Sequence, residues 1–483
     1  MLKPHSLQQT FLMEIIHVSA ECYPVAKAGG LGDVVGALPK YQNKLGHIAK
    51  VVMPMYRTKF LYSNEWDVVH KGGTNMGSWW FEYTVIHEST NKLGFDLYLV
   101  DIHGLLDREK IYGYEDDVER FTAFQIAVVD WIANWKHSPD VIHVHDHQAG
   151  LIPFMVKHCS AYRRLQNVPT VLTIHNGEYQ GWMGWDKSRY IPDWDTWRWG
   201  LLDWKGNINS LAAGIRTAWK VTTVSRSYLE ELRVTANGLE SLFEYERGKC
   251  VGILNGIDTH VWDPEIDSYL QYRFGFEEVE EGKQLNKEAL CEQFSLDINK
   301  PLIGFIGRLV GEKGADILPA AIGDAFYHIG RMMNFIILGS GFPEVEAQLN
   351  SLKSLAWGDY NVYIGYNEAL SHALYAGCDF LLMPSRVEPC GLNQMYAMRY
   401  GTVPVVRNTG GLKDTVVDYE DPGGYGLKFN QASVGDLTQS IWRSVQLYRD
   451  KTRMKNVRKR MMQLDFSWEK SVTEYLNVYE SLK

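Results

Sequence analysis

Lysine and glycine occur together in one turn near the start of the chain, in a pattern suited to binding an anion. The segment 27–33, KAGGLGD, follows an apolar run at 14–19 that predicts a buried strand, and it precedes a run at 34–38 that predicts a helix start. Glycines in such a turn let backbone N–H groups approach an anion, and the helix N-terminus adds favourable dipole charge. The candidate residues of this turn are Lys27, Gly29, Gly30 and Asp33.

Cationic side chains recur after a predicted strand in the second half of the chain. Arg308 and Lys313 lie in the turn 307–314, GRLVGEKG, directly after the apolar run 302–306. A guanidinium and an ammonium at the carboxyl end of a strand can clamp a diphosphate. The alternative is that both are solvated surface charges.

A third glycine turn, 407–412, follows the predicted strand 403–406 and opens a helix. Its residues Thr409, Gly410 and Gly411 have backbone N–H groups that the same phosphates could accept. The alternative is a plain glycine-containing turn.

A carboxylate stands between these two turns. Glu388 follows the predicted strand 380–383, where it could bind sugar hydroxyls or stabilise positive charge at a reacting carbon. Alternatively it caps the next helix as an N-terminal acid. We expect Cys390 to be a small buried residue, because nothing in the sequence indicates a lowered thiol pKa.

Histidines gather at two predicted strand ends. His143, His145 and His147 alternate along one strand end and would share a face, which is the pattern of a metal site. No carboxylate or cysteine with ligand spacing lies nearby except Asp146, so we expect no metal, and we expect Asp146 and a neighbouring histidine to line a cleft or to satisfy buried polar groups. His175 and Asn176 end the next strand, although a lone strand-end histidine is often structural.

Aromatic residues cluster after His175. Six tryptophans between Trp182 and Trp204 could offer flat faces to sugar rings, or could form a local aromatic core under a long loop. The D-x-D at 193–195 is expected about once by chance in a chain of this size, and we interpret it as accidental. The segment 30–36 resembles a dinucleotide fingerprint, but the acidic residue expected about 20 positions later is missing, which disfavours a dehydrogenase.

The elements that would position these residues alternate between strand and helix. Such alternation predicts two doubly wound parallel sheets, whose strand ends would carry the candidate residues. An irregular charged stretch at 263–287 separates the two series. The strands expected by pattern are 15–19, 49–53, 95–100, 141–145, 170–174 and 221–224, then 302–306, 335–338, 361–364, 380–383 and 403–406. We also expect helices over 120–135 and 467–481.

Length and composition restrict the class. A chain of 483 residues exceeds one ordinary core, and its net charge of -9 argues against a broad nucleic-acid surface. No apolar run is long enough for a membrane helix, and residues 1–12 lack the apolar core of a secretory signal. The six cysteines form no C-x-x-C pair, so we expect a reducing, cytoplasmic compartment.

From residue 13 to its end, the chain resembles bacterial glycogen synthases and plant starch synthases of glycosyltransferase family 5. No single motif is specific, but their ordered set is. It comprises KAGGL at 27–31, HD at 145–146, TIHN at 173–176 with YQG at 179–181, NGID at 255–258, GRL at 307–309, KG at 313–314, EPCGL at 388–392 and TGGL at 409–412. The resemblance implies a GT-B fold, in which two Rossmann-like α/β domains face each other across a deep cleft. The expected domains are 13–258 on the acceptor side and 259–464 on the nucleotide-sugar side, with a final helix within 465–483 packing back on the first.

The same resemblance implies roles. Lys27 and its glycines would approach the donor phosphates, Arg308 and Lys313 would stabilise the departing diphosphate, and Glu388 would contact the transferred glucose. Asp146 and His175 would line the sugar pocket, and Tyr366 would stack near the base. The substrate-binding set is completed by Asp33, Asn176, Cys390, Gly391, Leu392, Thr409, Gly410 and Gly411. These enzymes retain anomeric configuration and need no metal or other cofactor, because ADP-glucose is itself a substrate.

Four positions depart from the family's usual residues: Ala28, the pair His147-Gln148, Glu178 and Asn393. All four are expected near the substrate, so they bear on the choice of donor and acceptor.

The activity that the resemblance implies is elongation of an α-1,4-glucan from ADP-glucose. The alternatives are UDP-glucose as donor, a different acceptor such as a sugar phosphate, or a catalytically silent glucan-binding protein. The sequence does not indicate an oligomeric state.

Overall fold

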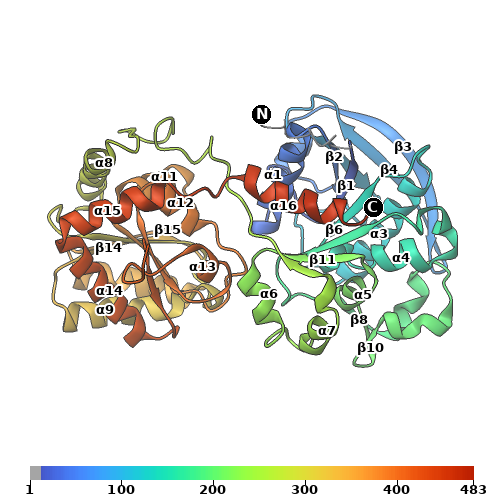
Figure 1. Ribbon diagram of the computed structural model, residues 1–483. Helices are drawn as coiled ribbons and strands as arrows, with labels where there is room; N and C mark the ends of the chain where they lie inside the picture. Colours follow the sequence, from blue (N-terminus) through green and yellow to red (C-terminus); the bar gives the residue numbers. More distant parts are fainter. Residues whose placement is uncertain (1–11) are drawn as a thin grey trace, which may run out of the picture. The chain divides into compact units, whose positions relative to one another are not determined.

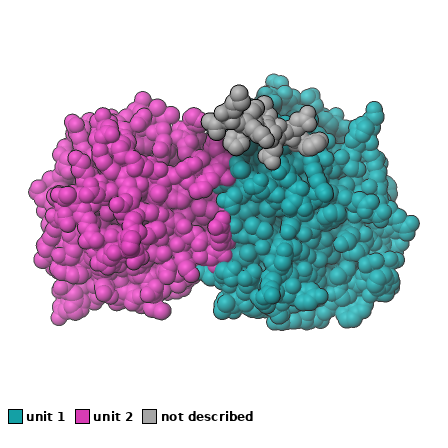
Figure 2. Space-filling model, in the orientation of Figure 1, with its two compact units in different colours: residues 1–224, 229–253, 471–483 teal, residues 225–228, 254–470 magenta. Residues whose placement is uncertain are grey.

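The computed structural model describes residues 12–483, and the predicted N-terminal tail lies almost wholly outside them. The chain divides into two compact units (Figures 1 and 2). Unit 1 comprises residues 1–224, 229–253 and 471–483, and unit 2 comprises 225–228 and 254–470. The main division therefore falls a few residues before the predicted start at 259. The end of the chain clusters with unit 1.

Unit 1 is built on a nine-stranded sheet with the order β12-β11-β7-β6-β1-β2-β5-β4-β3. All pairs are parallel except β5 with β4 and β4 with β3. Every residue of β6 and β7 is buried, as is typical of a parallel strand covered on both faces. The strands are β1 (Glu14–Val18), β2 (Ile48–Pro54), β3 (Trp66–Met76), β4 (Trp79–Glu88), β5 (Asp96–Asp101), β6 (Val141–His145), β7 (Thr170–Ile174), β11 (Lys220–Thr223) and β12 (Cys250–Gly252).

The remaining elements of this half connect these strands. A small antiparallel sheet has the order β8-β10-β9. Its strands are β8 (Trp182–Met183), β9 (Asp203–Trp204) and β10 (Asn207–Asn209). The helices are α1 (Gly30–Lys44), α2 (Lys59–Tyr62), α3 (Asp117–Ala133), α4 (Ile152–His158), α5 (Ser210–Thr217), α6 (Arg226–Leu232), α7 (Glu240–Tyr245) and α16 (Trp468–Glu480).

Unit 2 contains an all-parallel sheet with the order β15-β14-β13-β16-β17-β18. Its strands are β13 (Leu302–Ile306), β14 (Asn334–Gly339), β15 (Tyr360–Ile364), β16 (Phe380–Met383), β17 (Val403–Arg407) and β18 (Leu427–Phe429). Its helices are α8 (Val279–Phe294), α9 (Leu318–His328), α10 (Pro343–Leu355), α11 (Glu368–Gly377), α12 (Asn393–Arg399), α13 (Gly410–Thr415), α14 (Val434–Arg449) and α15 (Lys451–Met462).

The eleven strands expected from the sequence are all present, with their ends shifted by at most one residue. The two predicted helices are confirmed as α3 and α16, and the Rossmann-like α/β class is confirmed in each unit. Among the described residues, no helix is both long and apolar enough to cross a bilayer.

The strand orders identify where each sheet can bind a ligand. In an open parallel sheet the crevice lies at the carboxyl ends of two neighbouring strands whose connections run in opposite directions. That position falls between β1 and β6 in unit 1, and between β13 and β16 in unit 2. The candidate residues follow these strands.

Candidate active site

The glycine turn after β1 is organised by a carboxylate of the chain itself. Glu21 Oε2 accepts hydrogen bonds from the backbone N–H groups of Ala28 (2.6 Å) and Gly29 (2.9 Å). Its other oxygen accepts one from the hydroxyl of Tyr112 at 2.7 Å. The buried Glu21 therefore already satisfies the Gly29 N–H, and binding of an anion by this turn stays a prediction.

Lys27 is paired as well. Its Nζ lies 2.7 Å from Oδ1 of Asp33 in the first turn of α1, and the lysine side chain remains partly exposed. An exposed pair of this kind contributes little stability, roughly 0–1 kcal/mol. Asp33 thus orients the lysine at low cost, and a phosphate could compete for it.

Gly29 and Gly30 face open space. A Cβ atom built on either residue meets no other atom within 4 Å, and both residues are exposed. Packing of the chain therefore does not require glycine at these two positions. Room for a closely approaching ligand is the physical reason that remains.

The substitution Gly30→Ala is expected to raise the KM for the predicted nucleotide-sugar donor about tenfold without lowering stability. The added methyl fills ligand space, whereas alanine is favoured over glycine in a helix by up to about 1 kcal/mol. Steady-state kinetics and thermal unfolding check this. Gly435→Ala is the matched control, because Gly435 also lies in the first turn of a helix and faces open space. An unchanged KM in Gly30→Ala would contradict a ligand at this turn.

Asp146 connects the ends of β6 and β7. Its backbone has the unusual positive φ of 56°, and Oδ1 accepts the N–H of His175 at 2.7 Å and, more weakly, that of Asn176 at 3.5 Å. Burial raises the pKa of Asp146 to about 7, although the two backbone N–H groups act in the opposite direction and nearby Glu21 raises it further. The strained turn fixes His175 and Asn176 at the predicted crevice.

The raised pKa of Asp146 predicts a pH-dependent stability. The folded state holds this proton more tightly than the unfolded chain does, so the contribution is complete below about pH 4 and is lost as pH rises through about 7. Asp146→Asn keeps the accepting oxygen and removes the titration. We therefore expect its unfolding free energy, relative to the parent chain, to increase between pH 4 and 7. Denaturant titrations at several pH values measure this difference, and a difference constant with pH would contradict the assignment.

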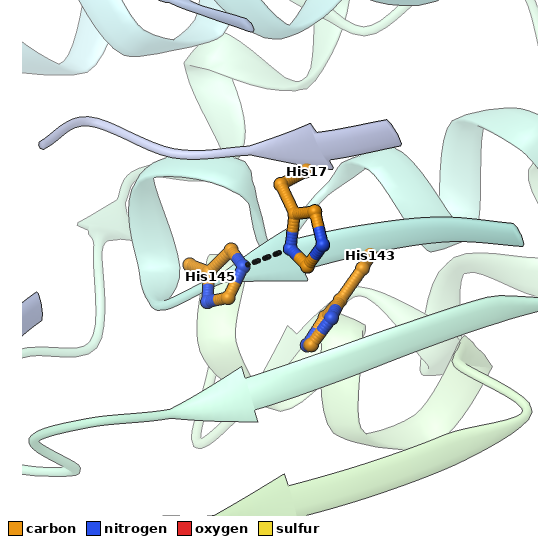
Figure 3. A group of neighbouring side chains, drawn as sticks. All are labelled: His17, His143 and His145. Atoms are coloured by element: carbon orange, nitrogen blue, oxygen red, sulfur yellow. Dashed lines mark hydrogen bonds between the residues drawn. The ribbon is translucent and has the colours of Figure 1, made fainter. Parts of the chain in front are cut away.

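The predicted histidine trio is only partly correct. His17, His143 and His145 lie together in the buried core of unit 1 (Figure 3), whereas His147 begins the turn after Asp146 and packs beside Gly181. The ring nitrogens of the three clustered histidines already bond one another or Gln42, Tyr479, Thr173 and His175. One nitrogen from each ring lies within 4.8 Å of the others, close enough for a metal ion, but each of these nitrogens already takes part in a hydrogen bond of the core.

In unit 2, the predicted cation and carboxylate form an ion pair at the β13/β16 crevice. Lys313 Nζ lies 2.6 and 2.7 Å from the two carboxylate oxygens of Glu388, which also accepts from the Ser385 hydroxyl at 2.8 Å. Glu388 is only 5% exposed, whereas the lysine is partly exposed. Asn393, one of the departures, donates to the Ile306 carbonyl at 2.8 Å and thereby fixes the start of α12 to the end of β13.

Arg308 projects from the same strand end as a largely exposed cation. Its side chain is 62% exposed and contacts only Glu312, at 3.1 Å, among the ion pairs of the described residues. Tyr366, which follows β15 in the same sheet, is 82% exposed. An exposed aromatic ring at this strand edge is available to stack on the flat ring of a ligand.

The third glycine turn differs from expectation. The N–H of Gly411 donates to the Glu388 carbonyl at 3.0 Å, and that of Thr409 donates to the Arg407 carbonyl at 2.9 Å. A Cβ on Gly410 or Gly411 would collide with the carbonyl of Glu388 or Cys390 respectively. These glycines therefore allow α13 to pack against the loop that carries Glu388, and the N–H groups of Thr409 and Gly411 have internal partners.

The three predicted residues that follow Glu388 closely in its loop have structural features of their own. Burial raises the pKa of Cys390 to about 12, which excludes a reactive thiolate at neutral pH. Gly391 has φ of +73°, and Leu392 is the N-cap residue of α12. These three residues shape the loop and present Glu388.

The tryptophans between Trp182 and Trp204 partly fit each of the two alternatives, a local aromatic core and exposed rings for sugars. Trp185 donates to Asp203, Trp204 donates to the Gly238 carbonyl, and Trp194 packs edge-on against Phe154. Three others are exposed: Trp182, Trp197 and Trp199. The segment is thus a local aromatic core that leaves some rings at the surface.

Sequence reasoning missed Glu21 and Tyr112, which hold the glycine turn. Glu21 carried a usable signal, because it follows β1 at one side of the switch point as Asp146 follows β6 at the other. Tyr112 lies in an irregular loop and carried none.

Comparison with known proteins identifies relatives along the whole chain. Residues 14–245 match the family described as the starch synthase catalytic domain, and residues 286–460 match glycosyl transferases group 1. Glycogen synthase of Flavobacterium johnsoniae is 54% identical over 97% of this chain and 98% of its own. A glycogen synthase of Streptococcus pneumoniae is 36% identical, covering 97% of this chain and 100% of its own. The catalytic domain of starch synthase IV from Arabidopsis thaliana, solved bound to ADP and acarbose, superposes with a TM-score of 0.87 at 30% identity, over 98% of this chain and 99% of that one.

Proposed function

The chain belongs to the glycogen synthase and starch synthase family of glucan-elongating glycosyltransferases with the GT-B fold, and we propose that it transfers glucose from ADP-glucose to an α-1,4-glucan. The relative solved with ADP and acarbose, an adenine nucleotide and an oligosaccharide analogue, supports this donor and acceptor.

The observation that carries the proposal is the charge arrangement after β13 and β16. A diphosphate leaving glucose accumulates negative charge, which preorganised cations stabilise more in the transition state than in the bound donor. Arg308 is largely exposed and held by its surface pair with Glu312, so it can turn toward an arriving phosphate, whereas Lys313 is already oriented by Glu388. Together they supply the positive charge that a metal provides in other transferases, so we propose that no metal or other cofactor takes part.

Glu388 has a second role in this proposal. Its carboxylate is buried and held by Lys313 and Ser385, which leaves it an acceptor for hydroxyls of the transferred glucose. Negative charge near the anomeric carbon also stabilises an oxocarbenium-like state. We assign binding of the diphosphate to unit 2. In unit 1, we assign Asp146 and His175 to the lining of the sugar pocket.

The departing phosphate is the base available for the acceptor hydroxyl. In this crevice of unit 2, the carboxylate of Glu388 is paired to Lys313, and the thiol of Cys390 stays protonated. We therefore assign neither side chain as the base. We propose that the phosphate takes the proton of the attacking hydroxyl from the same face, which retains the configuration at the anomeric carbon.

A donor panel tests the proposed function. Glycogen is incubated with radiolabelled ADP-glucose or UDP-glucose, and the product is digested to identify α-1,4 linkages. We expect transfer from ADP-glucose at a kcat/KM at least tenfold above that from UDP-glucose. Preferred transfer from UDP-glucose, transfer only to a sugar phosphate, or glucan binding without transfer would each overturn the proposal in favour of the corresponding alternative.

We propose a cytoplasmic location from the cysteines alone. All six are free, and five are buried. Thiols that stay unpaired in a chain of this size suit a reducing compartment.

A further inference from the structure

A continuous series of hydrogen-bonded side chains runs through the core of unit 1 to the end of β7. Gln42 Oε1 of α1 lies 2.8 Å from His17 Nε2, and His17 Nδ1 lies 3.0 Å from His145 Nε2 (Figure 3). His145 Nδ1 in turn lies 3.0 Å from His175 Nε2. The first three side chains are fully buried and His175 is nearly so, which makes each of these contacts a dry hydrogen bond.

The three imidazoles are all neutral at physiological pH. Burial lowers the pKa of His17 to about 4 and that of His175 to about 3, and it lowers the pKa of His145 well below its usual range. A neutral imidazole has one N–H donor and one bare nitrogen acceptor. In a series of such rings, whether the group at one end donates or accepts a hydrogen bond therefore fixes the tautomer of every ring in the series.

Gln42 fixes the direction of the hydrogen bonds at the end of the series opposite His175. Its Nε2 donates to the Tyr479 hydroxyl at 3.2 Å, which directs its Oε1 toward His17. Burial keeps Tyr479 protonated by raising its pKa, so this hydroxyl donates to His143 Nδ1 at 2.7 Å. The amide oxygen can only accept, so His17 must donate through Nε2.

The tautomers of the remaining rings follow from that donor. His17 Nδ1 is bare and accepts from His145 Nε2–H, and His145 Nδ1 is bare and accepts from His175 Nε2–H. His175 is left with its proton on Nε2 and a bare Nδ1.

We propose that Gln42, His17 and His145 are positioning residues that hold His175 in the Nε2–H tautomer, so that its Nδ1 accepts a hydrogen bond from a hydroxyl of the bound sugar. An isolated imidazole exchanges between two tautomers, and one of them would present a donor where an acceptor is needed. The inference rests on the proposed function only in assigning His175 to the sugar.

A neighbouring branch of the same core provides a matched control. His143 Nε2 bonds the Thr173 hydroxyl at 2.6 Å, and Thr173 bonds the Thr222 hydroxyl at 2.6 Å. These side chains are as deeply buried as the first series. None of these bonds involves His175, and Thr222→Val removes only the outermost of them, so it deletes a buried hydrogen bond without touching the series from Gln42.

Neutron diffraction from deuterated crystals of the full chain tests the tautomer directly. We expect deuterium on Nε2 of His175 and none on Nδ1. Deuterium on Nδ1 would overturn the inference, whatever the enzyme's donor or acceptor proves to be. This readout therefore remains valid if the proposed glucose transfer fails.

Variants test whether the series acts on function. Gln42→Met keeps the side-chain length but removes both hydrogen bonds, so we expect two His175 tautomers in the imidazole ¹⁵N spectrum and a kcat about tenfold lower. Thr222→Val is expected to lower the unfolding temperature while leaving the His175 spectrum and kcat unchanged. A single unchanged tautomer in Gln42→Met, or equal loss of kcat in both variants, would refute the positioning role.

Discussion

Lys313→Ala is expected to lower kcat for glucose transfer about 100-fold or more. The substitution removes the cation nearest to Glu388 and, in the proposed mechanism, half of the positive charge that stabilises the departing diphosphate. Because binding of the intact donor needs this charge less than the transition state does, the KM should change much less than kcat. Initial rates over a range of ADP-glucose concentrations, with glycogen saturating, measure both constants.

Stability needs a separate control in this experiment, because the substitution leaves the buried Glu388 without its partner, which can cost about 3–5 kcal/mol. Lys300→Ala is the matched control. Lys300 has similar exposure and also pairs with a largely buried aspartate, Asp359, which keeps Arg331 as a second partner, but Lys300 precedes β13 instead of following it. Lys313→Arg, which keeps the charge, should recover part of the rate. If Lys313→Ala and Lys300→Ala reduced kcat equally, the loss would be one of folding and the catalytic assignment would fail.

Arg308→Ala is expected to reduce kcat by a similar factor, roughly 100-fold, with no measurable loss of stability. The side chain is largely exposed and its pair with Glu312 lies at the surface, where such pairs contribute roughly 0–1 kcal/mol. Its effect must therefore come from a ligand. Rates and unfolding temperatures measured on the same preparation separate the two contributions.

Two comparisons sharpen the Arg308 experiment. Arg331→Ala removes another exposed arginine of unit 2 that is paired with a carboxylate, and it should leave kcat unchanged. Arg308→Lys should retain only part of the rate, because an ammonium cannot make the bidentate contact of a guanidinium with phosphate. Near-normal turnover of Arg308→Ala would show that the diphosphate does not depend on this strand end.

Eleven strands of the two sheets could be predicted from the sequence because most of their residues are buried. Runs such as 302–306 and 380–383 are nearly continuous apolar segments between helical patterns, so both their type and their ends could be predicted. The hairpin of β3 and β4 was missed for the opposite reason. Most residues of β3 are at least partly exposed, and polar residues interrupt its apolar pattern.

The positions of Arg308, Lys313 and Glu388 could be predicted because each follows a recognisable strand. Their pairing could not, since Lys313 and Glu388 are 75 residues apart and meet only through the adjacency of β13 and β16. The glycine turns show a related limit. Spacing predicted backbone N–H groups near an anion, but only the folded chain reveals that Glu21 or a carbonyl already accepts several of them.

Gln42 illustrates what no local pattern reveals. It is one polar residue on a helix, and its sequence neighbours give no reason to place it in the core. Its importance arises from β1 and β6 lying side by side, which brings His17 opposite His143 in register and adjacent to His145.

In the proposed mechanism, the carboxyl edge of the unit 2 sheet holds the departing diphosphate through Arg308 and Lys313. A crystal structure of the full chain with ADP would show this contact. We expect phosphate oxygens at about 2.7–3.2 Å from the side-chain nitrogens of both residues. Phosphates bound elsewhere, with Arg308 still on Glu312 and Lys313 still wholly engaged by Glu388, would contradict it.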